Sequence, residues 1–235
     1  MSGLYESASA LMRIADRQID SVAHNVSNLQ TPGYKRSVAF ANMISGSELF
    51  NDTVDLVSNY TVMRQGKMIS SGNSLDFAIE GEGFFAVRNG DVTVYSRQGQ
   101  FHRDADGRLI DGRGYALQQV GGGDIAVDDS PFSLADDGTM IVNGRPVARV
   151  ATYAPERADQ MTPVGEAHFA ADSNVMAPVD SKVRQNMLEA SNVTLGDEMV
   201  SMMAAMRRAE TGAKLMQMYD EMLGQALSKL GQGGQ

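Results

Sequence analysis

The sequence predicts an α+β protein: a discontinuous helical module of paired N- and C-terminal helices, coiled-coil-like, with an antiparallel all-β domain of barrel or sandwich type inserted between them. Three observations support this class. Apolar residues recur at helical spacing near the C-terminus, a comparable stripe runs through the N-terminal residues, and turn signals follow one another closely in the middle. The expected segments are an N-terminal helix at 1–33, an extended connection at 34–71, the β domain at 72–153, a return connection at 154–187 and a C-terminal helix at 188–235.

The C-terminal segment carries the most regular pattern of the chain. Its apolar positions alternate three and four residues apart, which is the 3.5-residue period of a coiled-coil seam. Thr194 and Asp197 are spaced as a variant of a capping box at its start, and Asp220 is the one charged seam position. The seam is rich in methionine and alanine, a composition that suits packing against several different neighbours. The seam positions are Leu195, Met199, Met202, Met206, Ala209, Ala213, Met216, Asp220, Leu223, Leu227 and Leu230.

The N-terminal segment repeats the pattern and ends at a strong stop signal. Thr31-Pro32-Gly33 terminates the helix, because proline disfavours helix at the preceding residue and glycine accepts a turn conformation. Neither terminal stripe has a partner nearby in sequence, so we expect the two helices to pack on each other. The N-terminal stripe consists of Leu4, Ala8, Leu11, Ala15, Ile19, Val22, Val26 and Leu29.

The middle of the chain has the pattern of short strands joined by tight turns. Residues 34–71 have weak periodicity and predict extended chain with one hairpin. Between 72 and 153, dipeptides that favour hairpin turns separate short apolar runs, which predicts the antiparallel β domain. These dipeptides are Asn89-Gly90, Asp106-Gly107, Asp137-Gly138 and Asn143-Gly144.

Composition narrows the function classes. A net charge of −9 disfavours nucleic acid and anionic membrane surfaces as partners. The chain has no cysteine, which excludes disulfides and thiol chemistry. No apolar run reaches the roughly eighteen residues of a membrane-spanning helix, and no signal peptide is visible at the N-terminus. We therefore expect no membrane insertion, and any export must use a route without a cleaved signal peptide.

No catalytic, cofactor-binding or metal-binding constellation is visible. The aspartates of Asp104–Gly107 lack the remaining ligands of a calcium loop, and a turn explains them. Asp128-Asp129 and Asp136-Asp137 lie beside turn formers, and Gly81-Glu82-Gly83 lacks the rest of a dinucleotide loop. The histidines show no ligand spacing and are expected to be ordinary surface or capping residues: His24, His102 and His168. The sequence predicts that the protein is not an enzyme.

Several blocks of the sequence resemble the flagellar rod and hook family of axial proteins. Together they span nearly the whole chain in the order that the family has, which makes the resemblance specific. It is carried by Asn25–Lys35 with its Asn-x-x-Asn-x-x-Thr-Pro-Gly-aromatic-basic pattern, Asn73–Phe85, Tyr95–Phe101 with Asp106–Leu109, and Ser191–Val193 followed by Glu198–Val200.

The resemblance implies a structural subunit of the flagellar basal-body rod, the helical drive shaft in the periplasmic space. The short chain looks most like a proximal-rod subunit, with a distal-rod subunit or another axial hook or rod component as the alternative. The implied partners are other rod subunits, further copies of the chain and the flagellar export apparatus, with the terminal helices in the inner tube and the β domain outside. A secreted coiled-coil binding module, or an enzyme with a scattered site, are the remaining alternatives.

Two groups of residues are expected to matter for assembly. The turn after the first helix should orient it, and it comprises Asn28, Thr31, Pro32 and Gly33. The seam residues expected to pack between subunits are Leu4, Leu11, Val22, Leu29, Met199, Met206, Met216, Leu223 and Leu227.

Overall fold

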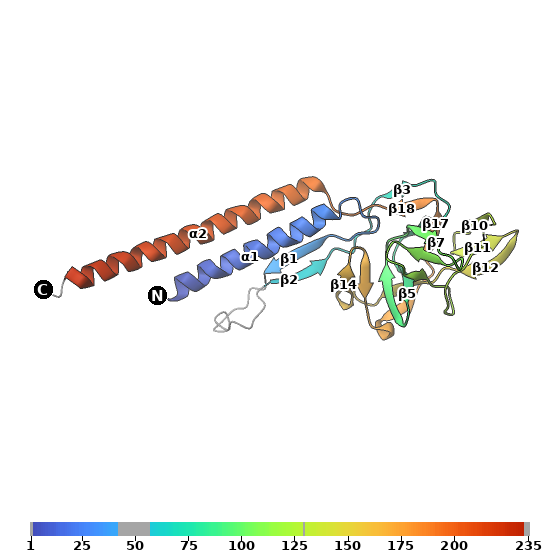
Figure 1. Ribbon diagram of the computed structural model, residues 1–235, viewed down its shortest axis with the longest axis horizontal. Coiled ribbons are helices and arrows are strands. Elements are labelled where there is room, and N and C mark those ends of the chain that lie inside the picture. Colours follow the sequence, from blue (N-terminus) through green and yellow to red (C-terminus); the bar gives the residue numbers. More distant parts are fainter. Residues whose placement is uncertain (1, 42–56, 129, 233–235) are drawn as a thin grey trace. The chain divides into compact units, whose positions relative to one another are not determined.

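The computed structural model describes residues 2–41, 57–128 and 130–232 of the chain (Figure 1). Its contacts divide the chain into two compact units. The first, here called the helical unit, comprises Met1–Ser27, Ser37–Tyr60 and Thr194–Gln235, and the second, the β unit, comprises Asn28–Arg36 and Thr61–Val193. Both units are discontinuous in sequence. Within the described ranges, no helix combines the length and the apolarity that crossing a membrane requires.

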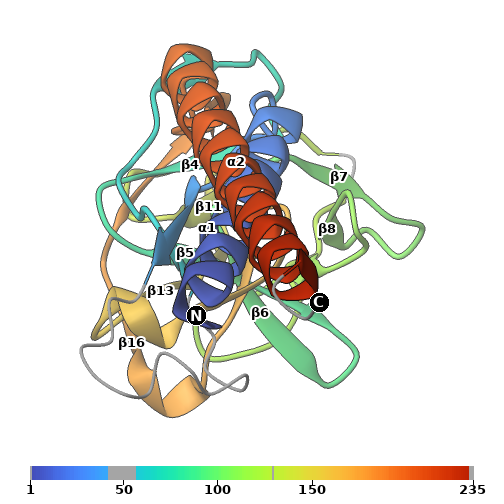
Figure 2. The same cartoon turned by 90° about the vertical axis from the view of Figure 1, so that its left-hand side faces the viewer.

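The helical unit contains the two long helices α1 (Ser2–Ser27) and α2 (Leu195–Gln232), which lie side by side and run in opposite directions (Figures 1 and 2). The two strands β1 (Ser37–Ala41) and β2 (Val57–Thr61) pair with each other. At the start of α2, the Thr194 hydroxyl donates to the Asp197 carboxylate. Acidic residues in this first turn also favour the helix, because its N-terminus carries partial positive charge.

Short antiparallel strands make up the β unit, as the sequence predicts. Residues 154–187, expected as a return connection, contain several of these strands. Sequence reading did not predict them, because each alternates apolar and polar residues over too short a stretch to be recognised. The strands are β3 (Met68–Ser70), β4 (Phe77–Glu80), β5 (Phe84–Asn89), β6 (Val92–Ser96), β7 (Phe101–Arg103), β8 (Leu109–Asp111), β9 (Ala116–Leu117), β10 (Phe132–Leu134), β11 (Thr139–Val142), β12 (Arg145–Arg149), β13 (Thr152–Pro155), β14 (Thr162–Gly165), β15 (His168–Ala170), β16 (Met176–Pro178), β17 (Lys182–Gln185) and β18 (Met187–Glu189), with the short 3-10 helices η2 (Ala158–Gln160) and η3 (Ser173–Val175).

The largest sheet follows the order β14-β15-β6-β5-β9-β8-β7, with β13 paired to β5 and β16 paired to β13. Smaller sheets pair β10-β11-β12, β17-β4 and β18-β3. The expected hairpin dipeptides each stand between two paired strands: β5 and β6, β7 and β8, β10 and β11, and β11 and β12. Among the described strands the pairings do not close into a ring, so the barrel or sandwich detail stays a prediction.

Strand β5 lies between two hydrophobic cores. Phe85 and Val87 belong to the larger core, which also contains Phe77, whereas Phe84 and Ala86 point to the second core. Successive side chains of a strand point to opposite faces, so the uninterrupted apolar run of β5 places the strand inside the unit rather than on its surface.

His168 and Asp111 form a buried polar pair in the largest sheet. The His168 imidazole Nε2 lies 2.6 Å from the Asp111 carboxylate, and both side chains are almost fully buried. The backbone amides of Arg113 and Tyr115 also donate to this carboxylate, at 2.9 and 3.0 Å. Burial raises the pKa of Asp111, but the hydrogen bond from His168 and those from the two amides outweigh it and hold the pKa below its ordinary value. The expectation of a surface or capping histidine is therefore wrong for His168.

This arrangement predicts a pH-dependent contribution to stability. Because the pKa of Asp111 is depressed in the folded state, its stabilisation is present above the unfolded value of about 4 and is lost as the pH falls through the folded value. We expect Asp111→Asn to lower the free energy of unfolding at neutral pH by about 1–3 kcal/mol. The difference from the unaltered chain should shrink below about pH 3.

Urea unfolding at several pH values measures this difference. The control is Asp91→Asn, at an exposed position, which should change stability little at any pH. A gap between Asp111→Asn and the unaltered chain that stays the same from neutral to acid pH would contradict the assignment.

Candidate functional site

The described part of the chain shows no arrangement typical of an active site. No group of three or more His, Asp or Glu side chains is placed to hold a metal ion in these ranges. An open depression of about 450 Å³ lies beside Glu80, Glu82, Asp180 and Lys182, and no histidine lines it. The features that stand out are instead a polar network in the β unit and an exposed apolar face in the helical unit.

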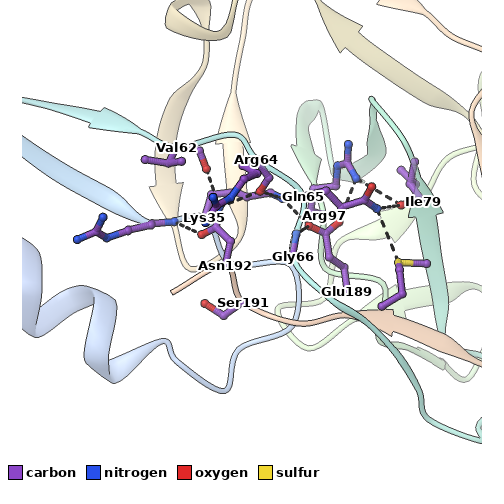
Figure 3. A network of polar contacts seen from close by, with 12 residues as sticks. Lys35, Val62, Arg64, Gln65, Gly66, Ile79, Arg97, Glu189, Ser191 and Asn192 are labelled. Carbon is purple, nitrogen blue, oxygen red and sulfur yellow. Dashed lines mark hydrogen bonds and ion pairs between the residues drawn. The ribbon is translucent and has the colours of Figure 1, made fainter. Parts of the chain in front are cut away.

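A single buried carboxylate, that of Glu189 in β18, is the centre of the polar network (Figure 3). Its Oε1 accepts hydrogen bonds from Lys35 Nζ at 2.5 Å and from the backbone amide of Gly66 at 2.7 Å. Its Oε2 accepts from Arg97 Nη1 at 3.0 Å. Glu189 therefore joins three segments that are far apart in sequence, and we call Lys35, Arg97 and Glu189 the carboxylate hub.

The two cations of the hub have further partners that fix their positions. Lys35 Nζ also donates to the carbonyl of Arg64 at 3.1 Å, and Arg97 Nη2 donates to that of Gly81 at 2.7 Å. Burial lowers the pKa values of Lys35 and Arg97, and the negative charge of Glu189 opposes that shift. Two buried cations share one carboxylate, so each depends on Glu189 for its compensation.

Asn192 supplies a second set of bonds beside the hub (Figure 3). Its side-chain amide donates to the carbonyls of Val62 and Arg64 at 2.8 Å, and its side-chain oxygen accepts from the amide of Arg36 at 2.7 Å. Its backbone amide donates to the carbonyl of Tyr34. The segment that follows the first helix and the segment that precedes the second are thus joined directly inside the β unit.

The turn at Gly33 fits against the backbone next to Arg97. Gly33 has φ +72°, and a Cβ at this position would lie 2.2 Å from the carbonyl carbon of Arg97. Its amide donates to the carbonyl of Glu189 at 2.7 Å. Thr31 closes the turn, since its hydroxyl donates to the side-chain oxygen of Asn28 at 3.1 Å. These contacts hold the chain at Thr31 and Gly33, and the close backbone leaves no room for a side chain at Gly33. That the turn orients the first helix stays a prediction.

In the helical unit, one face of α2 contacts α1 through small residues. Ala8 and Ala15 of α1 and Ala205 of α2 have no exposed surface, and a Cβ on Gly212 would meet the carbonyl of Ala8 at 3.2 Å. Small side chains let two helices approach closely. Because Ala8 and Ala15, like Ala205 and Gly212, are seven residues apart, antiparallel helices can repeat this close contact along their length.

Polar residues close the end of this helix pair at which the chain leaves α1. The side-chain amide of Asn25 donates to Glu198 at 3.1 Å and to the carbonyl of Ser37 at 2.7 Å, while its oxygen accepts from the amide of Ser37 at 2.9 Å. Asn25 thus links α1, β1 and the first turn of α2. The expected site residues do not include it, although it lies in the N-terminal family motif.

The face of α2 that contacts α1 is turned relative to the expected seam. The buried Glu198, Ala205 and Gly212 each precede a seam position by one residue, whereas the seam residues between them, Met202, Ala209 and Met216, stay half-buried. The contacting face is therefore displaced by less than one residue's turn around the helix. Seam residues Met199 and Met206 are consequently exposed by 59% and 53% of their surface. Both are large, and the small residues beside them permit the closer contact, so the methionines remain outside it.

The other residues expected to pack between subunits lie in varied surroundings. Val22 is buried, whereas Leu11, Leu29, Met216 and Leu223 are half-buried. The side chains of Leu4 and Leu227 lie outside the described residues. Sequence periodicity found the two helices but could not distinguish the side that faces α1 from the side that stays open.

The hub predicts a large effect of removing one charge. Glu189→Gln should lower the free energy of unfolding of the β unit by about 3–5 kcal/mol, because it leaves Lys35 and Arg97 buried without a carboxylate. Urea unfolding followed by circular dichroism measures the loss. The matched control Glu156→Gln, at an exposed position, should stay within about 0.5 kcal/mol. Equal stability of the two variants would show that the hub contributes nothing.

The turn predicts a steric effect that a second glycine can isolate. Gly33→Ala should destabilise the β unit by more than about 1 kcal/mol, because it combines a disfavoured positive φ with a backbone collision. Gly72→Ala is the control: Gly72 has φ +73° but nothing within 4 Å of the added Cβ. The excess loss of Gly33→Ala over Gly72→Ala in chemical unfolding measures the collision. Without an excess, the close approach to Arg97 is not a constraint.

Comparisons with known proteins identify the family to which these segments belong. Two family models match the chain: the flagellar hook protein FlgE/F/G D1 domain at residues 78–143, and the flagellar basal body rod FlgEFG protein C-terminal at residues 184–229. The second match contains Glu189 and Asn192 together with most of α2.

Curated relatives match over the full length. The flagellar basal-body rod protein FlgF of Caulobacter vibrioides is 30% identical, over 98% of both chains. FlgF of Mesorhizobium japonicum is 29% identical over 97% of both chains, and FlgG of Bacillus subtilis is 27% identical over 95% of this chain and 97% of its own. The full-length likeness and the two family domains show that the chain belongs to the family of flagellar basal-body rod proteins, the structural subunits of the rod, with FlgF and FlgG both among its relatives.

Proposed function

We propose that the protein is a FlgF-like structural subunit of the proximal rod, and that it polymerises through its terminal helices into the helical shaft that transmits torque. The observation that supports assembly most directly is the exposed apolar stripe of α2, which begins at Leu195 and continues through Met199, Met203 and Met206. These residues follow one another at steps of four, four and three, so they share one side of the helix. A stripe of this kind is typical of a surface that another protein covers.

Alignment length favours FlgF over FlgG. The alignments with two FlgF proteins extend over 244 and 238 residues, close to the 235 of this chain. Three alignments with FlgG proteins extend over 264, 255 and 258 residues and so contain more insertions, whereas a fourth extends over 242. FlgG, the distal-rod protein, is the second candidate because its identity to this chain is nearly as high.

The assembly follows from one repeated contact. A head-to-tail contact that does not close into a ring builds a helical filament. In this proposal, residues 1–33 and 188–235 form a coiled-coil-like assembly module, and the exposed side of α2 packs on the helices of neighbouring copies and of other rod subunits. Residues 72–153 form the outer, sandwich-like domain, joined through 34–71 and 154–187. The packing residues remain Leu4, Leu11, Val22, Leu29, Met199, Met206, Met216, Leu223 and Leu227.

The carboxylate hub suits the transmission of torque. The chain leaves α1 at Ser27 and enters α2 at Leu195, and the segments next to these points, near Tyr34 and Asn192, are bonded to each other within the β unit. In this proposal, force carried along one helix reaches a segment of the β unit that is hydrogen-bonded to the segment leading to the other helix. The turn residues Asn28, Thr31, Pro32 and Gly33 would keep the first connection in one conformation.

The remaining features of the proposal concern location and partners. The subunit would reach the periplasmic rod through the flagellar export apparatus without a cleaved signal peptide. It would have no enzymatic activity, no cofactor, no nucleic-acid or small-molecule ligand and no inserted membrane segment. The net charge of −9 and the absence of cysteine are consistent with such a role.

The exposed stripe provides the test. We expect the double variant Met199→Asp with Met206→Asp to fold as a monomer, since both side chains face solvent, but to fail to assemble, since burying an unpaired carboxylate is costly. Motility of a strain lacking the chain, complemented with each variant, and electron microscopy of its isolated basal bodies are the measurements.

The control adds one charge at a polar exposed position of the same helix, Gln225→Asp. It should restore motility and rod assembly. Normal rods containing the double variant would refute assembly through this stripe, and a strain that the unaltered chain does not complement would refute the rod function itself.

A further inference from the structure

Five methionines on α2 are more than half exposed, with exposed fractions between 51% and 59%: Met199, Met203, Met206, Met218 and Met222. In contrast, Met140, Met161 and Met176 of the β unit are nearly or fully buried. The chain contains 16 methionines and no cysteine, so methionine sulfur is the only sulfur that an oxidant can attack. Among the described methionines, the more than half-exposed ones that we name here lie on α2, the helix through which we propose that the subunit assembles.

Methionine responds to oxidation more strongly than the other apolar side chains. A peroxide transfers one oxygen atom to the thioether: an S–O bond forms, the O–O bond breaks, and the second peroxide oxygen leaves as water or alcohol. The sulfur gives up two electrons, and the peroxide takes them up. The product, methionine sulfoxide, has a polar oxygen that needs a hydrogen-bond partner once it is removed from water.

We propose that the exposed methionines of α2 form an oxidation-sensitive modification site that stops assembly when a peroxide converts them to sulfoxides. In the free subunit the added oxygens face solvent, so the fold remains intact. In a contact between subunits the same oxygens would lie among apolar side chains. The faster reaction of these methionines with peroxide follows from their exposure alone. The effect of oxidation on assembly rests on the proposed function.

Three of the exposed methionines lie together on one side of α2. Met199, Met203 and Met206 are four and three residues apart, so they lie on one stripe of α2 beside the exposed Leu195. Each subunit brings several oxidisable groups to one surface, and a filament repeats that surface along its length. A modest degree of oxidation per subunit therefore affects many contacts.

Peroxide treatment and mass spectrometry test the reactivity. The purified full-length chain is exposed to limiting hydrogen peroxide, and the sulfoxide content of each methionine peptide is followed with time. The five α2 methionines should oxidise at least about tenfold faster than Met140, Met161 and Met176, because oxidation follows exposure. Equal rates on the two groups would overturn the proposal.

Rod assembly under peroxide tests the consequence. In a strain lacking the chain, the unaltered gene or the gene with Met199→Leu, Met203→Leu and Met206→Leu combined is switched on only after peroxide is added, so that every rod counted was assembled during the treatment. Leucine keeps the apolar volume but cannot be oxidised. The leucine variant should build new rods at a peroxide dose that reduces rod formation with the unaltered chain several-fold, whereas the control Met161→Leu should stay sensitive.

Reducing the sulfoxides back to methionine distinguishes an effect of sulfoxide from other oxidative damage. Treatment of the oxidised, purified subunit with both methionine sulfoxide reductases, which act on the two sulfoxide epimers, should restore its uptake into rods in permeabilised cells. Equal peroxide sensitivity of the leucine variant and the unaltered chain, or no recovery after reduction, would overturn the proposal and leave the rod function standing. If the unaltered chain does not restore rod formation even without peroxide, the rod function is refuted. The peptide measurements would then still show whether the α2 methionines react faster than the buried ones.

Discussion

The β unit depends on one buried carboxylate that two cations share. Glu189 accepts hydrogen bonds from Lys35, Arg97 and the amide of Gly66, which come from three segments far apart in sequence. An isolated charge would be costly to bury, so these segments are stable only together. The β unit therefore needs contacts between distant segments in addition to its hairpins. The turn at Gly33 lies directly against the backbone of Arg97, so it fits only while that backbone is held in place.

A different principle governs the helical unit. Its helices approach each other through residues with little or no side chain, such as Ala8, Ala205 and Gly212, and polar bonds from Asn25 fix one end. This close contact uses only part of the apolar surface of α2. The methionines beside it are left on the outside, where they can serve contacts between subunits and can also be reached by oxidants.

The motifs by which the family is identified have a structural explanation. Asn25, Lys35 and Asn192 each use a polar side chain to bond backbone or charged groups of a distant segment. None of them lies in an arrangement that resembles a catalytic centre. In each unit, such residues hold distant segments of the chain in one arrangement: Asn25 does so in the helical unit, and Lys35 and Asn192 do so in the β unit.

The sequence by itself determined the two terminal helices, the hairpin turns of the β domain and the family, because periodicity, turn-forming dipeptides and ordered motif blocks are local signals. Only the tertiary structure decided which side of α2 is covered, since that depends on the size of residues on α1 and not on the period of α2 alone. It also revealed that Lys35, Arg97 and Glu189 share one site, and that His168 is buried against Asp111. Such pairings join residues far apart in the chain, and nothing in the local pattern around any of them names its partner.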